Sequence, residues 1–459
     1  MSSTSPIELL APAGTLRNMR YALAYGADAV YAGQPRYSLR VRNNDFQLEN
    51  LQIGIQETHA LGKHFYVASN LLPHNNKLGS YIKNMQPVID MKPDALIMAD
   101  PGLIMMVRET WPDMPIHLSV QANTMNWAAV RFWQSIGVTR IILSRELSLN
   151  EIEEIRQQCP DIELEVFVHG ALCIAYSGRC LLSGYFNHRD ANQGTCTNAC
   201  RWDYKMSETA EDGCGDVIPI QDFKLTEQQG GDALAGHESA RHPLADQVYM
   251  LAESQRPEEL MPVFEDEHGT YIMNSKDLQA IEHVQRLVDI GIDSLKIEGR
   301  TKSHFYVGRV SQAYSQALRD ARAGRPFDPH LNDALNALAN RGYTDGFYTR
   351  KRAGASQNYE TGNSVFSHQR FVGEVLRWDE TRQMAEVEVK NRFSIGDELE
   401  LMTPAGRERF TLTSMFAARH GEEAMEVAPG SGHRVWIPLP IVPEPAHLAM
   451  ISRIIPADE

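Results

Sequence analysis

The first half of the chain alternates short apolar runs with longer stretches in which apolar residues recur every three or four positions. The short runs predict β-strands and the longer stretches predict amphipathic α-helices. Strands are expected at residues 7–10, 29–31, 64–68, 95–98, 116–120, 140–143, 163–168 and 294–297. Helices are expected at residues 16–25, 50–61, 102–110, 126–136, 149–158, 275–290 and 303–323. Eight alternating units predict an α/β fold, a (β/α)8 TIM-like barrel, with an open doubly wound sheet as the alternative.

The hydrophobic period changes twice after the seventh predicted strand. Residues 207–259 are acidic, rich in Gly, Gln and His, and have little periodicity, which predicts a long insertion on the functional face of the barrel. From residue 371 apolar and polar residues alternate, which predicts strands at 371–376, 384–389, 398–402, 409–413 and 435–438. Such strands are typical of a small antiparallel β-barrel. We therefore expect a barrel domain at residues 1–345, a linker at 346–370 and a C-terminal β-barrel domain at 371–459.

The composition narrows the classes of protein. Of 459 residues, 43% are hydrophobic and 22% are charged, which excludes global disorder. The 44 Lys and Arg residues against 59 Asp and Glu give a net charge of −15, which argues against non-specific coating of nucleic acid but permits a local basic groove. No apolar run reaches the ~18–20 residues that span a bilayer, and the first residues lack the features of a secretory signal. We therefore expect a cytoplasmic protein without a membrane partner.

Polar side chains follow several of the predicted barrel strands. Barrel enzymes carry their chemistry at the C-terminal ends of the strands, where side chains from different strands meet. Alternation around the fifth strand places His117, Ser119, Gln121 and Asn123 on one face. The sixth and eighth strands end near Arg145, Lys296, Glu298 and Arg300. These residues predict a wet, charged pocket, and a structural layer of salt bridges is the alternative.

Four of the six cysteines follow the seventh strand closely: Cys173, Cys180, Cys196 and Cys200. Without export a disulfide framework is not expected, and four sulfur ligands suit a metal site. The C-x6-C-x15-C-x3-C spacing favours an iron–sulfur cluster, while zinc and unrelated thiols stay open because only the second pair has the spacing usual for zinc. Cys159 and Cys214 are interpreted as buried or incidental thiols.

Several sequence motifs resemble those of one known family. They read EVFVHGALCIAYSGRCLLS at residues 165–183, LAPAG at 10–14, YGADAVY at 25–31, NSKDL at 274–278 and KIEGR at 296–300. These motifs are similar to those of the collagenase-like peptidase family (peptidase family U32), and the resemblance covers nearly the whole chain. GQPRYSLRVRNN at 33–44 and GTCTNACRW at 194–202 resemble the members of that family that hydroxylate tRNA.

The resemblance implies a tRNA modification enzyme. Relatives hydroxylate RNA bases or ubiquinone precursors and carry a [4Fe–4S] cluster. The implied reaction is hydroxylation of the wobble uridine to 5-hydroxyuridine, dependent on prephenate. Partners would be tRNA, prephenate, and an electron donor or accessory protein. Gln279 stands where many relatives have a cysteine, so the fourth cluster ligand, beside Cys173, Cys180 and Cys196, falls to Cys200.

Roles for other residues follow from their chemistry. Arg36, Arg40 and Arg42 come after the second strand, and guanidinium groups bind carboxylates and phosphates, so prephenate or tRNA could be their partner. A solvated basic loop is the alternative. With these arginines, the substrate-binding candidates are Gln121, Asn123, Arg145 and Arg300. The catalytic candidates are Glu165, His169, Lys296 and Glu298. For Glu165 and His169, proton transfer and hydrogen bonding within the core are both open.

Two other functions remain as alternatives. A peptidase is implied by the family's name, but no Gly-x-Ser-x-Gly motif is present. The segment from His237 to His242 resembles a zinc protease motif, yet its second histidine comes five residues after the first instead of the four that place both on one helix face. A non-catalytic RNA-binding iron–sulfur protein would use the same groove without forming a product.

Overall fold

The computed structural model describes residues 6–34, 36–39, 45–172, 276–340, 342–349, 369–418 and 423–455. It also describes the backbone of six short strands: β8 (Thr209–Glu211), β9 (Val217–Pro219), β10 (Tyr249–Glu253), β11 (Arg256–Val263), β12 (Glu265–Asp266) and β13 (Gly269–Thr270). They form three antiparallel pairs: β8 with β9, β10 with β11, and β12 with β13.

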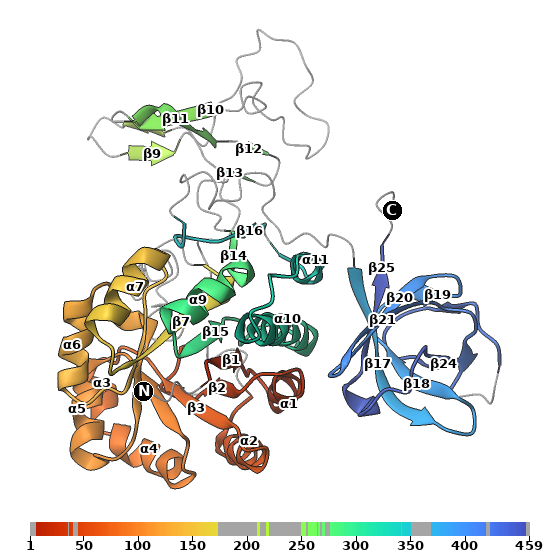
Figure 1. Cartoon of the computed structure of the whole chain (residues 1–459), viewed down its shortest axis with the longest axis horizontal. Coiled ribbons are helices and arrows are strands. Elements are labelled where there is room, and N and C mark those ends of the chain that lie inside the picture. The colour runs from red at the N-terminus through yellow and green to blue at the C-terminus, as the bar shows by residue number, and fades with distance from the viewer. Residues whose placement is uncertain are drawn as a thin grey trace.

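Eight parallel strands form a closed barrel (Figure 1). They are β1 (Glu8–Pro12), β2 (Ala29–Gly33), β3 (His64–Ser69), β4 (Ala95–Met98), β5 (Ile116–Leu118), β6 (Arg140–Ile142), β7 (Glu163–Ala171) and β15 (Ser294–Ile297). Closure comes from β15, which pairs with β7 on one side and with β1 on the other. The predicted TIM-like barrel is therefore confirmed, and the open sheet is excluded.

Helices connect the strands and cover the barrel. They are α1 (Leu16–Ala24), α2 (Leu48–Ala60), α3 (Asn75–Leu78), α4 (Tyr81–Asp90), α5 (Pro101–Thr110), α6 (Trp127–Ser135), α7 (Leu149–Gln158), α9 (Val284–Ile290), α10 (His304–Arg322) and α11 (His330–Asn336). Local sequence fixes several starts. The Ser148 hydroxyl and the Glu151 carboxylate form a capping box at α7, and the hydroxyl of Ser303 caps α10. None of the described helices is long and apolar enough to cross a membrane.

The predicted helix at residues 275–290 is wrong in its first half. Residues 277–279 form β14 (Asp277–Gln279), which pairs antiparallel with the end of β7. A short 3-10 turn (Ile281–His283) precedes α9. The reason is that β7 extends to Ala171, beyond its predicted end, and its last residues need a hydrogen-bonding partner. The alternation predicted for the fifth strand also stops early, because the Ser119 hydroxyl starts a 3-10 turn at Val120–Ala122.

The C-terminal residues form antiparallel sheets around a separate core, as predicted. The larger sheet contains β17 (Gln369–Asp379), β18 (Met384–Val389), β20 (Glu398–Thr403), β21 (Gly406–Thr411), β22 (Phe416–Ala417), β24 (Arg434–Ile437) and β25 (Met450–Ile454). Its strand order is β21-β20-β25-β17-β18-β24-β22, so β21 is an edge strand. A smaller sheet pairs β19 (Phe393–Ser394) with β23 (Val427–Ala428).

This C-terminal domain packs on the flank of the barrel, against α1 and α10 (Figure 1). The hydroxyl of Tyr25 donates to the Leu448 carbonyl at 2.7 Å. Phe305 stacks on Phe371 with ring centroids 4.8 Å apart. Inside the contact, Arg309 is 2% exposed and forms an ion pair with Glu400. A buried ion pair and stacked rings hold the two domains in one arrangement.

Candidate active site

The C-terminal ends of the barrel strands surround a polar cavity, the mouth cavity. Its lining residues are Tyr31, Leu39, Ala68, Asn70, Ile97, Ser119, Val120, Gln121, Ile142, Arg145, Phe167, Lys296, Glu298 and Arg300. Six residues predicted from strand ends are among them, contributed by β15 and by the segments that follow β5, β6 and β15. The positions of these six follow from the parallel barrel, which brings all strand ends to one side.

Aromatic rings and cations form the walls of the mouth cavity. The ammonium of Lys296 lies 4.3 Å from the ring centroid of Tyr31, and the guanidinium of Arg300 lies 5.8 Å from the same ring. On another wall, the guanidinium of Arg145 lies 3.8 Å from the ring centroid of Phe167. Cation–π contacts of this kind fix the direction of each charged group against its aromatic wall.

Positive charge exceeds negative charge in the mouth cavity. Arg145 donates to the Glu298 carboxylate at 2.8 Å and to the Ala171 carbonyl at 3.2 Å. Among the described lining residues, Glu298 is the one carboxylate, against the cations Arg145, Lys296 and Arg300. The cavity is therefore suited to an anionic ligand, because guanidinium groups bind carboxylates through paired hydrogen bonds.

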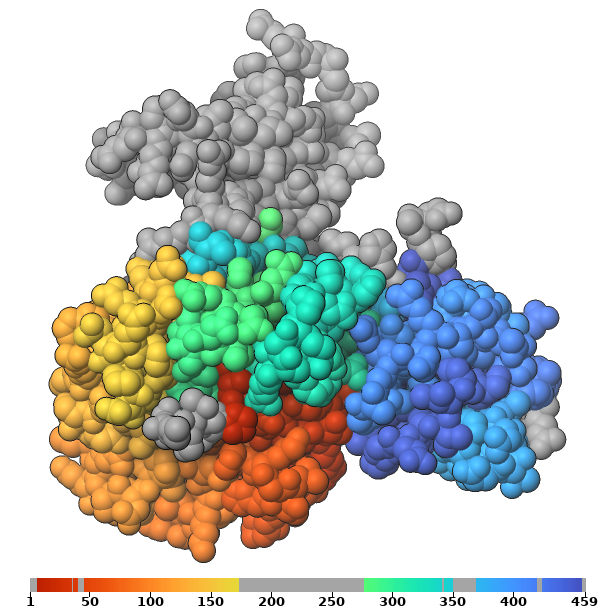
Figure 2. Space-filling model, in the orientation of Figure 1, coloured from red at the N-terminus to blue at the C-terminus, as the bar shows by residue number. Residues whose placement is uncertain are grey.

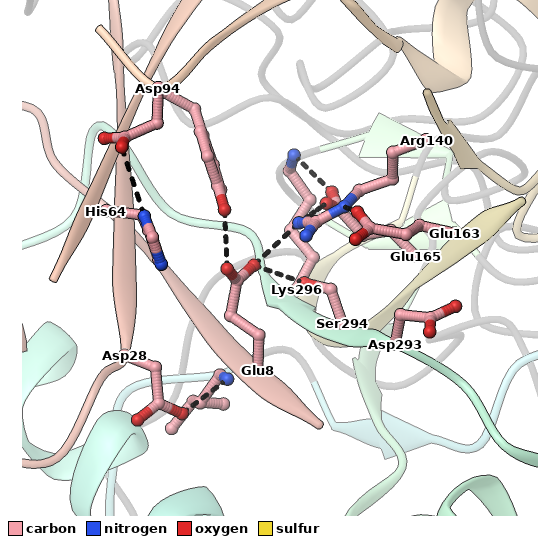
Figure 3. Close-up of polar contacts among 12 residues, drawn as sticks. Glu8, Asp28, His64, Asp94, Arg140, Glu163, Glu165, Asp293, Ser294 and Lys296 are labelled. Atoms are coloured by element: carbon pink, nitrogen blue, oxygen red, sulfur yellow. Dashed lines mark hydrogen bonds and ion pairs between the residues drawn. The ribbon is translucent and has the colours of Figure 1, made fainter. Parts of the chain in front are cut away.

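A buried ionic network lies beneath the mouth cavity, and we call it the floor. It consists of Glu8, Tyr66, Arg140, Glu163, Glu165, Ser294 and Lys296. Figure 3 shows Glu8, Arg140, Glu165 and Lys296 converging inside the barrel. The Lys296 ammonium is 2.7 Å from Glu165, and Arg140 is 2.7 Å from Glu8, 2.8 Å from Glu163 and 3.3 Å from Glu165.

Hydroxyl groups complete the floor. The Glu8 carboxylate accepts from the hydroxyls of Tyr66 at 2.6 Å and Ser294 at 2.9 Å. Glu165 is fully buried, and it lies in the floor and not among the residues that line the cavity. Lys296 is the link between the two layers, because its stem lines the cavity while its ammonium contacts Glu165.

Burial opposes the charge of Lys296. The side chain is 3% exposed, and this burial lowers its pKa from the usual value, while the neighbouring Glu165 carboxylate acts in the opposite direction. A lysine in this setting can give up a proton more readily than an exposed one, and Glu165 is the group within hydrogen-bond distance that could receive it. The same geometry also fits a purely structural ion pair.

His169 is buried outside the mouth cavity. It is 1% exposed, and its ring lies among those of Tyr306, Tyr314 and Tyr343, with centroids 5.9, 5.5 and 5.3 Å away. Burial lowers its pKa to about 3, helped by the charge of Lys302, so the ring is neutral at pH 7. Nδ1 lies 3.4 Å from the Tyr314 hydroxyl, and Nε2 has no hydrogen-bond partner among the described residues.

Other predicted residues lie elsewhere. Arg36 is exposed, stacks over the Tyr37 ring at 5.9 Å, and does not line the cavity. Asn123 has a left-handed backbone (φ 54°) and accepts from the Ser144 hydroxyl at 2.9 Å, also outside the lining. Arg40, Arg42 and the segment from His237 to His242 lie outside the described residues.

Sequence reasoning missed Tyr31, Asn70 and Phe167 in the cavity lining. Asn70 directly follows β3, so the rule that found Arg145 applies to it as well. Tyr31 and Phe167 lie within apolar strands and have no signal that separates them from core residues.

The predicted metal ligands Cys173, Cys180, Cys196 and Cys200 lie outside the described residues. The residues that are described contain no group of three His, Cys, Asp or Glu side chains able to hold a metal. β7 ends at Ala171 beside the mouth cavity, two residues before Cys173, so the cysteine segment begins at the same end of the barrel. Four thiolates are the usual donor set of an iron–sulfur cluster, so the donor chemistry fits. Cys159 is a buried free thiol, as interpreted from the sequence.

Comparisons with known proteins cover both domains. Residues 14–358 match the model of Peptidase family U32, and residues 367–451 match that of the Peptidase family U32 C-terminal domain. The chain is 60% identical to tRNA hydroxylation protein P of Escherichia coli strain K12 over 439 residues, 94% of each chain. It is 58% identical to the Haemophilus influenzae protein of the same name, over 94% of this chain and 93% of that one. A Porphyromonas gingivalis protein named collagenase is 25% identical over 88% of each chain. The chain belongs to peptidase family U32.

Proposed function

We propose that this protein is a tRNA uridine C5 hydroxylase, which converts the wobble uridine to 5-hydroxyuridine in a prephenate-dependent reaction with a [4Fe–4S] cluster. The observation that carries the proposal is 60% identity along 94% of both chains to a protein named for tRNA hydroxylation. The collagenase relative is far less similar, at 25% identity. Peptidase activity is therefore the weaker candidate.

The charge of the mouth cavity supports a dicarboxylate co-substrate. Prephenate carries two carboxylates, and the described part of the lining offers Arg145, Lys296 and Arg300 against one carboxylate, Glu298. Its aromatic walls, Tyr31 and Phe167, suit the six-membered ring of such a ligand. In this proposal the cations orient the carboxylates, and Glu165 below holds Lys296 in place through its 2.7 Å ion pair.

The cluster would be held by Cys173, Cys180, Cys196 and Cys200. A cluster of this type supplies one-electron chemistry. Four residues before Cys173 in the sequence, the chain places the neutral, buried ring of His169 among three tyrosine rings.

Complementation of a deletion strain tests the proposal. The wild-type gene should restore 5-hydroxyuridine in tRNA, measured by mass spectrometry of nucleosides, and Cys173→Ser should not. Cys159→Ser is the matched control, since this buried thiol donates to the Trp127 carbonyl at 3.5 Å and stands apart from the four cysteines in the sequence. Protein purified without oxygen should contain about four irons, and Cys173→Ser should lose them.

Two results would overturn the proposal. Wild-type protein that binds tRNA but restores no 5-hydroxyuridine would favour the non-catalytic RNA-binding protein. Hydrolysis of gelatin by purified protein, with tRNA left unmodified in cells, would favour the peptidase.

A further inference from the structure

A groove runs along the contact between the barrel and the C-terminal domain, and we call it the flank groove. Its walls are α10, α11 and the β20–β21 hairpin, and its ends are open. The lining residues are Arg309, Gln312, Ala313, Gln316, Arg319, His330, Leu331, Asp333, Ala334, Gln369, Glu400, Pro404, Ala405, Gly406, Arg407 and Arg409. Figure 2 shows the turquoise surface of α10 and α11 meeting the blue surface of the C-terminal domain along this line.

Strand alternation turns two arginines toward the barrel. Glu400 and Met402 of β20 face α10, where Glu400 forms the ion pair with Arg309. In the β20–β21 ladder, Arg409 pairs with Glu400 and Arg407 pairs with Met402. Paired residues share a face of a sheet, so both arginines project on the same side as Glu400. Because β21 is the edge strand, they stand beyond the packed contact, at the rim of the groove.

The positive charge of the flank groove is not balanced by carboxylates. The Glu400 carboxylate is already paired with Arg309, and the Asp333 carboxylate lies 3.4 Å from the His330 ring. Arg319 donates to two neutral groups, the Ser315 hydroxyl at 2.9 Å and the Gln316 amide oxygen at 2.6 Å. Neither Arg407 nor Arg409 has a side-chain partner within the described part of the chain. Four arginines therefore line the groove against two carboxylates, in a protein of net charge −15.

The charges of Arg407 and Arg409 act on the buried guanidinium of Arg309. Burial lowers the pKa of Arg309, the Glu400 carboxylate raises it, and the charges of Arg407 and Arg409 lower it again. The three guanidinium groups therefore repel one another across the rim. A polyanion in the groove would relieve that repulsion.

The groove has a direction relative to the mouth cavity. α10 follows β15, so its first turn starts at the mouth end, and near its last turn Arg322 donates to the carbonyl of Ile7 just before β1. Arg309 and Arg319 are ten residues apart on α10, which corresponds to about 15 Å along the flank. Arg309, with Arg407 and Arg409 near it, therefore lies closer to the mouth end of the flank than Arg319 does.

We propose that the flank groove binds the phosphate backbone of tRNA while the target uridine lies at the mouth cavity. This inference rests on the proposed function. No Phe, Tyr or Trp is among the described lining residues, so contact through guanidinium–phosphate pairs is favoured over base stacking. An acidic protein repels RNA over most of its surface, so such a groove also decides where tRNA can approach.

The test is the double variant Arg407→Ala, Arg409→Ala in the full-length protein, with deproteinised tRNA from a deletion strain as the probe. The loss of two phosphate contacts should weaken binding, and it should reduce the slope of log affinity against log salt by about 1.4 to 1.8 units. Both side chains are at least partly exposed and have no side-chain partner among the described residues, so the variant should unfold at the wild-type temperature.

The matched control is Arg382→Ala, Arg392→Ala, which removes two exposed arginines of the same domain that do not line the groove. It should keep the wild-type affinity and slope. Wild-type binding by the groove variant, or an equal loss in the control, would overturn the inference. If wild-type protein restores 5-hydroxyuridine in cells while the groove variant binds normally, only the groove assignment fails. If wild-type protein restores none, the proposed function itself fails.

Discussion

The floor and the mouth cavity are adjacent layers of one barrel, yet they use charge differently. In the floor, Arg140 and Lys296 meet three carboxylates, and every contact is between groups of the protein itself. In the mouth cavity, Arg145 has one carboxylate partner and Arg300 donates to the carbonyl of Leu39. Charge that is satisfied internally maintains structure, whereas excess charge of one sign at an open cavity is available to a ligand.

Lys296 connects these two layers and makes the contrast testable. Its ammonium pairs with Glu165 in the floor and also lies 4.3 Å from the ring centroid of Tyr31 in the cavity wall. A change that removes a floor residue should act first on stability. A change that removes a cavity cation should act first on activity.

The largest effect is expected for Arg140→Ala. This residue is 5% exposed and joins Glu8, Glu163 and Glu165, so its removal leaves the buried Glu8 carboxylate without a cation. We expect a loss of about 3–5 kcal/mol in the free energy of unfolding, measured with urea. Arg20→Ala is the control, because its ion pair with Glu57 is exposed and should cost less than about 1 kcal/mol. Equal effects in the two variants would contradict the structural role of the floor.

The next effect is expected for Arg145→Ala in the mouth cavity. The variant removes one of three cations and leaves Glu298 without its 2.8 Å partner. A charge-assisted hydrogen bond contributes about 1.5–3 kcal/mol, so 5-hydroxyuridine in cells should fall roughly 10- to 100-fold. Arg145→Lys keeps the positive charge but lacks the paired donors, so its level of 5-hydroxyuridine should lie between those of wild type and Arg145→Ala. Full modification by Arg145→Ala would remove this residue from the site.

Much of this contrast could be predicted from the sequence. Strand ends of a parallel barrel share one side, which is why Arg145, Lys296 and Glu298 were found together. The floor could not be predicted from the sequence, because Glu8 and Arg140 are far apart in the chain and lie in strands whose apolar pattern predicts only a hydrophobic core. Tyr31 was missed for the same reason, since an aromatic residue in an apolar strand predicts burial and not a cavity wall.

The failures in the fold have a similar cause. Residues 277–279 form a strand only because the end of β7 needs a partner, and no local pattern encodes that need. The Arg309–Glu400 pair joins domains across 91 positions, so the flank groove has no sequence signature. The start of α10, in contrast, was predicted to within one residue: the helix expected at 303–323 begins at His304, with the Ser303 hydroxyl as its cap.

The buried His169 gives a further test, through the dependence of the free energy of unfolding on pH. Its folded pKa of about 3 lies below the usual 6.5, so the neutral ring stabilises the fold above pH 6.5. As the pH falls, the unfolded chain binds the proton first, and that stability is lost progressively between about pH 6.5 and 3. From pH 7 to 5 the loss should be about 2 kcal/mol. His169→Asn should flatten this part of the stability profile, and an unchanged acid slope would show that other groups cause it.

The smallest effect is expected for Arg36→Ala, which separates the mouth cavity from the loop that leads to it. The sequence placed Arg36 with the substrate-binding residues, but its guanidinium lies over the Tyr37 ring and does not reach the lining. Its backbone N–H donates to the Gln34 side chain at 2.8 Å, and this contact survives the substitution. We therefore expect less than about 0.5 kcal/mol change in stability and 5-hydroxyuridine within about twofold of wild type. A loss as large as that of Arg145→Ala would mean that the anionic ligand extends beyond the cavity onto this loop, and the boundary between loop and cavity would have to be redrawn to include it.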